Sequence, residues 1–163
     1  MLRLLNGLRD APDFESYEGP VLLGGNATGV FMHEMVGHRL ESGYRGGLFK
    51  TFGTKIFPDF IQIIDDPTTS CYNDIQLTGH YKYDDEGCPA QAVTCIKDGV
   101  LLSMLTSRTP YYAGSVSNGH GRGEVDKETI ARQANFFVST SRPVTDSKIR
   151  KMFVNELKRQ NLE

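Results

Sequence analysis

Two histidines and a glutamate, His33, Glu34 and His38, lie within six residues of one another. A neutral imidazole is a common zinc ligand, and a glutamate beside it can take a proton from metal-bound water. In the familiar pattern H-E-x-x-H, the two histidines lie four positions apart and share one face of a helix. Here they are five positions apart, which places them about 140° apart on a regular α-helix. Two side chains that far apart cannot share one metal, so this chemistry requires a local distortion of the helix.

A π-bulge would supply that distortion, because it adds one residue to a turn, and such bulges are frequent at functional sites. Gly37, directly before His38, is a position at which the helix backbone could be distorted. We therefore expect a helix over residues 29–40 that is irregular near Gly37, with the imidazoles of His33 and His38 close enough to share a metal. The alternative is two unrelated histidines on a buried helix, which would leave the helix regular and the rings on separate faces.

The elements around this helix follow from local patterns. Residues 20–24 are a short apolar run bounded by glycine and predict a buried strand. Asn26 or Thr28 could cap the helix that follows. The helix is apolar on more than one side, which predicts that it is largely buried.

Strands are also predicted at residues 60–64 and 133–138, and the hairpin at 92–105 is the clearest signal in the chain. Its turn, Lys97-Asp98-Gly99, supplies the positive φ angles that a tight turn needs. Residues 107–131 are rich in glycine and predict a loop. After Pro143, apolar residues at helical spacing predict an amphipathic C-terminal helix capped by Asp146. These elements predict an α+β fold with a mostly antiparallel β-sheet, a buried motif helix and a C-terminal amphipathic helix.

Amino-acid composition limits the partners and the cellular compartment that can be expected for this chain. The chain has 163 residues, enough for one domain, with 18 basic and 20 acidic side chains and a net charge of −2. Electrostatics therefore does not suggest nucleic acid as a partner. Three cysteines without a C-x-x-C motif favour a reducing compartment, and no apolar run is long enough to predict a membrane helix. The N-terminus does not have the pattern of a secretory signal, so we expect a cytoplasmic protein.

Other polar residues have less specific interpretations. His80 and His120 lie in glycine-rich segments and are expected at the surface. The acidic clusters at 65–66 and 84–86 lie in turn sequences, and turn formation explains aspartate there without a catalytic role. Glu41 is either a hydrogen-bond partner of a ligand imidazole or a solvated carboxylate at the end of the helix. Arg108 could bind a peptide carboxylate, because guanidinium suits bidentate pairing.

The sequence resembles the TldD/PmbA family over about residues 20–142. The resemblance is carried by residues 21–41, which contain the H-E-x-x-x-H motif, and by four further motifs in the family's order: 64–68, 83–89, 96–101 and 117–122. The family was named for modulation of DNA gyrase and is described as metalloproteases. It contains one subunit type with the histidines and one without, and the motif here resembles the TldD-like, catalytic type. The resemblance implies that His33 and His38 are zinc ligands and that Glu34 is the general base.

The resemblance also implies that parts of the protein lie outside this chain. Family members are longer, with an α/β domain before this region and more β structure after it, which contains a cysteine as the third zinc ligand. Cys71, Cys88 and Cys95 cannot be matched to that cysteine. We therefore expect residues 1–18 to be a linker or the end of a preceding domain, and residues 19–163 to be part of the C-terminal catalytic domain.

The function expected from these arguments is a zinc-dependent peptidase acting on extended or unfolded peptides. The resemblance implies a homo- or heterodimer with a TldD/PmbA-type subunit, and no membrane or direct nucleic-acid contact is expected. One alternative is a non-catalytic module that binds a peptide or partner linked to gyrase modulation. Another is an inert fragment. Because the third ligand and the other domains are expected outside this chain, we expect residues 1–163 alone to bind zinc poorly or not at all, to lack peptidase activity and to self-associate.

Overall fold

The computed structural model describes residues 2–13, 16–43, 47–111 and 114–162. The chain divides into two compact units, one formed by residues 24–143 and the other by residues 1–23 with 144–163. The sequence contains three glycines in residues 43–47, which suggests a flexible rim for a cleft, but this segment lies partly outside the described residues.

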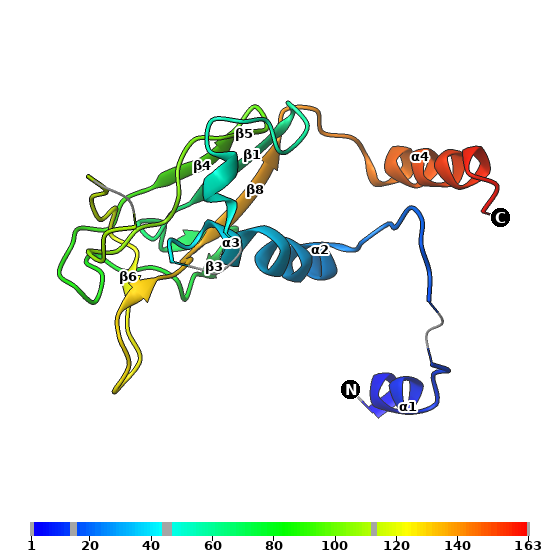
Figure 1. Cartoon of the computed structure of the whole chain (residues 1–163). Coiled ribbons are helices and arrows are strands. Elements are labelled where there is room, and N and C mark those ends of the chain that lie inside the picture. Colours follow the sequence, from blue (N-terminus) through cyan, green and yellow to red (C-terminus); the bar gives the residue numbers. More distant parts are fainter. Residues whose placement is uncertain (1, 14–15, 44–46, 112–113, 163) are drawn as a thin grey trace. The chain divides into compact units, whose positions relative to one another are not determined.

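The larger unit contains a four-stranded sheet in the order β5-β4-β1-β8 (Figure 1). Each pair of neighbours is antiparallel. The strands are β1 (Ile61–Asp65), β4 (Val93–Lys97), β5 (Val100–Leu101) and β8 (Phe136–Thr140). Ile63 and Asp65 are both buried, as expected for alternate residues on one face of a strand. The predicted α+β class with a mostly antiparallel sheet is confirmed.

The hairpin between β4 and β5 forms as predicted. Asp98 and Gly99 have φ angles of 50° and 76° and connect the two strands directly. A side chain at Gly99 would also be obstructed, because a Cβ there would lie 2.1 Å from the backbone oxygen of Phe57. This turn therefore requires glycine for both conformation and space.

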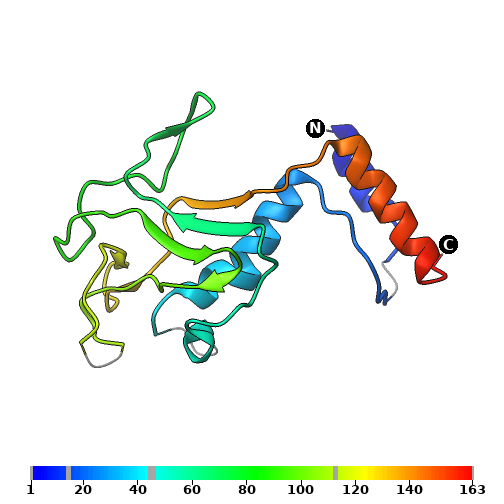
Figure 2. The same cartoon turned by 90° about the horizontal axis from the view of Figure 1, so that it is seen from above.

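The motif helix runs along one face of the sheet (Figure 2). It consists of α2 (Gly25–Met32), a π-helical turn η1 (His33–Gly37) and α3 (His38–Leu40). Val36 and Leu40 are buried. They belong to a core made with residues of the sheet and of the segment after it: Ile63, Val93, Cys95, Ile96, Leu101, Met104 and Leu105. The later half of the helix is thus held by hydrophobic burial.

Three predictions about this region are wrong. Residues 20–24 form no strand. The N-cap of α2 is Gly24, whose extended backbone has no side-chain cap bond, so neither Asn26 nor Thr28 caps the helix. The first half of the helix is not buried, since α2 has no buried residue and Val30 is 64% exposed. The apolar side chains of α2, the N-terminal half of the motif helix, therefore do not make it buried.

Several short elements complete the larger unit. The predicted strand at 133–138 begins three residues later, at Phe136. Two small strands lie in the segment predicted as a loop and pair antiparallel: β6 (Gly121–Arg122) and β7 (Ile130–Ala131). A second small pair and a 3-10 turn are β2 (Cys71–Tyr72), β3 (Ile75–Gln76) and η2 (Leu48–Thr51).

The smaller unit contains two helices, α1 (Leu2–Arg9) and α4 (Asp146–Arg159). The predicted C-terminal helix is confirmed, but its cap is Thr145 rather than Asp146. The Thr145 hydroxyl accepts a hydrogen bond from the Lys148 N–H, and Asp146 lies in the first turn, where its charge favours the helix dipole. None of the described helices combines the length and apolar content needed to cross a membrane.

Candidate metal centre

The π-helical turn brings the two motif histidines together. The His38 N–H donates to the His33 carbonyl, five residues earlier, which is the hydrogen bond of a π-helix. The two imidazole centroids are 4.6 Å apart, with the rings nearly perpendicular at 79°. Potential ligand atoms of His33, Glu34 and His38 all lie within 4.8 Å of one another. The predicted distortion is confirmed, and the alternative with the rings on separate faces is wrong.

Gly37 has a different role from the predicted one. Its φ of −53° and ψ of −57° are ordinary helical values that any residue adopts, so the turn does not need its flexibility. A Cβ on Gly37 would instead lie 2.1 Å from Oε1 of Gln133. Glycine here makes room for a side chain from the other end of the unit.

Glu41 orients the His38 ring. Its carboxylate is 4% exposed, and its two oxygens lie 3.1 and 3.2 Å from His38 Nδ1. A carboxylate only accepts hydrogen bonds, so Nδ1–H is the donor and Nε2 carries the lone pair. That nitrogen is turned toward Glu34. Of the two interpretations of Glu41, the structure supports the hydrogen-bond partner of a ligand imidazole.

Glu34 lies on the open side of the histidine pair. Its side chain is 61% exposed, with Oε1 3.8 Å from His33 Nε2 and Oε2 3.9 Å from His38 Nε2. These distances are longer than hydrogen bonds and leave the carboxylate beside both nitrogens without direct contact. It is therefore placed to accept a proton from a water held between the rings.

A cavity of about 550 Å³ opens beside His38. It is lined by residues of the helix end and of β7: His38, Glu41, Ser42, Gly43, Ile130, Ala131 and Arg132. Arg132 Nε lies 3.4 Å from Glu41 Oε1, and the Gln133 N–H donates to the same oxygen at 3.2 Å. Sequence reasoning missed both residues, since neither belongs to a motif and each is about 90 positions from Glu41.

The two imidazoles of His33 and His38 suit a divalent metal. A usual catalytic zinc site has three protein ligands, so one more protein ligand is needed. Among the described residues, no cysteine belongs to the His33–Glu34–His38 group. Cys71 is exposed, whereas Cys95 is buried in the core. Burial, followed by the nearby charge of Asp65, raises the pKa of Cys95 to about 12, which disfavours the thiolate that a metal needs.

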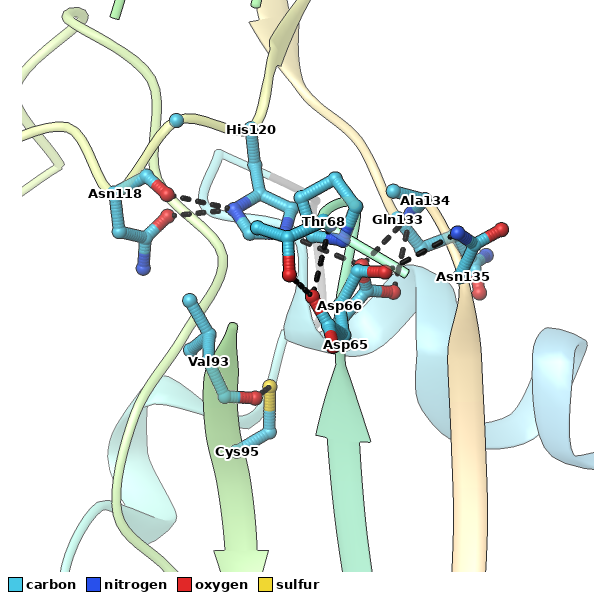
Figure 3. Close-up of polar contacts among 12 residues, drawn as sticks. Asp65, Asp66, Thr68, Val93, Cys95, Asn118, His120, Gln133, Ala134 and Asn135 are labelled. Atoms are coloured by element: carbon cyan, nitrogen blue, oxygen red, sulfur yellow. Dashed lines mark hydrogen bonds and ion pairs between the residues drawn. The ribbon is translucent and has the colours of Figure 1, made fainter. Parts of the chain in front are cut away.

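His120 is not at the surface, and that prediction is wrong. It is fully buried, with Nε2 3.2 Å from Asp65 Oδ1 and Nδ1 3.0 Å from both Asn118 oxygens (Figure 3). Asp65 also accepts the Ala134 N–H. The pair joins the end of β1 to two segments that follow the hairpin, so its role is structural.

The other candidates fit their plainer interpretations. His80 is exposed, as predicted, and its Nδ1 contacts the Pro67 carbonyl. Asp66 accepts the N–H and hydroxyl of Thr68, the bonding of an aspartate in a turn. Arg108 is exposed, and its backbone N–H donates to Glu86 Oε2. Binding of a peptide carboxylate by Arg108 stays a prediction.

Of the aspartates at 84–85, Asp84 bonds within its own turn, whereas Asp85 bonds to the segment at Arg122 and Gly123. Asp84 accepts the N–H groups of Glu86 and Cys88. The Gly123 N–H, and then the charge and hydrogen bond of Arg122, hold the pKa of Asp85 below its usual value. These bonds account for both carboxylates without acid–base chemistry.

Comparison with known proteins shows the family to which the chain belongs. Residues 16–161 match the family model of the PmbA/TldA metallopeptidase C-terminal domain. A metalloprotease of Methanothermobacter thermautotrophicus is 35% identical over 68% of this chain and 24% of its own length. A metalloprotease of Archaeoglobus fulgidus is 34% identical over 85% of this chain and 31% of its own length. The zinc metalloprotease TldD homolog of Saccharolobus solfataricus is 30% identical over 75% of this chain and 27% of its own.

Among solved structures, a Thermotoga maritima protein whose name links it to DNA gyrase modulation has the same fold. Its TM-score is 0.58 at 20% identity, covering 75% of this chain and 27% of that one. The chain therefore spans about a quarter to a third of the length of the relatives it matches. On the family model and these identities, this chain belongs to the PmbA/TldA metallopeptidase family and carries its C-terminal domain over residues 16–161.

Proposed function

We propose that this chain contributes the metal-binding helix of a zinc-dependent peptidase. The observation that carries the proposal is the π-helical turn, because it gathers His33, Glu34 and His38 within 4.8 Å despite their five-residue spacing. A helix without a functional constraint has no need of this rare turn. The name of the Saccharolobus solfataricus relative supports zinc as the metal.

His33 and His38 would hold the zinc through Nε2, with Glu41 keeping the His38 ring in the required tautomer. The third protein ligand would come from outside these 163 residues. Zinc bound here would polarise a peptide carbonyl and acidify a water molecule. Glu34 would accept the proton from that water as it attacks, and would deliver it to the leaving amine nitrogen. The carboxylate thus returns to its starting charge at the end of the reaction.

We propose extended or unfolded peptides as substrates. The cavity beside His38 and the exposed carboxylate of Glu34 leave the site open to solvent in the described part of the chain. A peptide in extended form presents its carbonyls to such a site without first having to unfold. We further propose a dimer with a second TldD/PmbA-type subunit and a cytoplasmic location, for which three free cysteines are suited.

The test is a peptidase assay on the protein at the length of its relatives. Glu34→Gln replaces a carboxylate by an amide of the same size, so the two imidazoles stay in place and the base is lost. We expect the turnover of an unfolded substrate to fall by about 10²- to 10⁴-fold. Metal content, measured by elemental analysis, should stay close to that of the wild type.

A matched control is Glu124→Gln, which changes an exposed carboxylate that pairs with Lys127. It should leave turnover unchanged. If Glu34→Gln removes zinc together with activity, Glu34 is a ligand and not the base. If it leaves turnover intact, the proposed reaction is wrong.

A further inference from the structure

The carboxamide of Gln133 lies against both motif imidazoles. Its Nε2 is 3.3 Å from His33 Nε2 and 3.5 Å from His38 Nδ1. An amide nitrogen only donates hydrogen bonds, so its contact with His33 uses the lone pair of Nε2. A metal takes that same lone pair from a neutral imidazole. The amide and a metal therefore compete for one atom.

The backbone around Gln133 is fixed by three hydrogen bonds, of which the one between Ala134 and Asp65 can be followed in Figure 3. Its own N–H donates to Glu41 Oε1 at 3.2 Å. The preceding N–H, of Arg132, donates to the His120 carbonyl at 2.9 Å, and the following N–H, of Ala134, donates to Asp65 at 3.0 Å. These bonds hold the segment against the histidine helix, so the place of the Gln133 side chain is set by the fold.

The side chain itself is held less well than its backbone. Oε1 of Gln133 is buried and has no hydrogen-bond partner among the described residues, which destabilises this conformation. The oxygen lies against Gly37, where a Cβ would come within 2.1 Å. The contact with His33 is also longer than the usual hydrogen bond of 2.9–3.0 Å. The carboxamide can therefore leave while its backbone stays.

We propose that Gln133 is a positioning residue that opposes metal binding by engaging the lone pair of His33. This inference rests on the proposed metal site. It adds that the metal affinity of that site is set below its maximum by a residue 100 positions away in the sequence. Gly37 is required because it admits the carboxamide, and Gln133 withdraws when a metal takes His33.

The experiment compares zinc affinity in variants of the 163-residue chain after removal of metal by a chelator. Gln133→Met keeps the length of the side chain and removes the donor, and Gln133→Ala removes the whole group. By calorimetry, both should bind zinc about two- to tenfold more tightly than the wild type, the range for one ordinary hydrogen bond. Gln76→Met, on the exposed strand β3, is the control and should leave the Kd unchanged.

Nitrogen-15 spectra locate the effect independently of zinc. In chelator-treated protein, the His33 Nε2 resonance should move with Gln133→Met and not with Gln76→Met. During the zinc titration the His33 and His38 resonances should both respond. If neither responds in any variant, the metal site and this inference both fail. If both respond but the Gln133 variants have an equal or weaker affinity, only this inference is overturned.

Gly37→Ala supplies a second test, because its methyl group would displace the Gln133 oxygen. It should tighten zinc binding in the wild type and have much less effect in the Gln133→Ala background, provided that thermal melting shows all variants folded. This non-additivity is the mark of two residues acting through one contact. Equal effects in both backgrounds, or an unmoved His33 resonance, would overturn the inference.

Discussion

Among the described residues of the larger unit, two histidine–carboxylate pairs lie within hydrogen-bond distance and have almost the same geometry. His38 Nδ1 is 3.1 Å from Glu41, and His120 Nε2 is 3.2 Å from Asp65. Their surroundings differ, because both side chains of the second pair are fully buried whereas His38 is 20% exposed. The two pairs also differ in the atoms that lie near the second nitrogen of each histidine ring.

The other nitrogen of His120, Nδ1, faces the two oxygens of Asn118. Both nitrogens of that ring therefore face oxygen atoms of neighbouring residues, so neither is turned toward an open ligand position. Nε2 of His38 instead faces Glu34 and the His33 ring. A histidine–carboxylate contact thus defines a ligand only when the second nitrogen is turned toward an open ligand position.

The largest effect should come from breaking the buried pair. Asp65→Ala would leave His120 buried without its partner and the Ala134 N–H without its acceptor. We expect the free energy of unfolding, measured in urea, to fall by about 3–5 kcal/mol. Asp85→Ala breaks a pair with Arg122 that is about 40% exposed, and should cost about 0–1 kcal/mol. Similar losses in the two variants would refute the structural role of the buried pair.

Glu41→Gln should change metal binding more than stability. Its amide can still accept from His38 Nδ1, but the negative charge that fixes the ring and raises its basicity is lost. We expect zinc affinity in the protein at its relatives' length to fall by about 10- to 100-fold. Unfolding in urea should shift less than with Asp65→Ala. A variant that binds zinc normally would show that Glu41 serves only to hold Arg132 and Gln133.

Zinc added to the 163-residue chain should distinguish the histidines directly. With two imidazoles instead of three protein ligands, we expect weak binding that dialysis reverses, no peptidase activity, and concentration-dependent association in ultracentrifugation. Resonances of His33 and His38 should respond, while His120 should not. Stoichiometric zinc after dialysis, with Cys71, Cys88, Cys95, His80, His120 or Glu41 as the third ligand, would contradict this expectation.

Burial near Asp65 should also have a smaller effect, on the reactivity of the Cys95 thiol. The pKa of Cys95 is raised to about 12 by burial and then by Asp65, against about 8.5 in the unfolded chain. In native protein at pH 8, a thiol reagent should modify exposed Cys71 quickly and Cys95 only after unfolding.

The stability consequence of Cys95 follows from the same pKa difference. The folded state keeps the proton, so this contribution to stability is complete below about pH 8.5 and is lost as the pH rises toward 12. By pH 9 the free energy of unfolding should have fallen by about 1 kcal/mol. Urea unfolding at pH 7.5 and 9 should show this decline in the wild type and less of it in Cys95→Ala. Equal declines in the two proteins would assign the pH dependence to other groups.

Local patterns predicted the parts of the fold that depend on neighbouring residues. Asp98-Gly99 specified the hairpin turn, because only a few residue types adopt two consecutive positive φ angles. The same kind of reasoning failed for residues 20–24 and for the burial of α2. Apolar composition there shows what could be buried, but burial depends on which surfaces the rest of the molecule brings against it.

Residue types and spacing alone specified the chemistry of the candidate metal centre and the distortion that it needs. His33, Glu34 and His38 are ligand types, and a spacing of five residues requires a π-turn if the rings are to meet, since backbone hydrogen bonds set the angle per residue. Only the tertiary structure decided that His120 is structural, that Glu41 orients His38, and that Gln133 reaches His33. Those contacts, apart from that of Glu41 with His38, join positions 55 to 100 residues apart. The partner of a buried polar group is fixed by long-range packing, which no local pattern records.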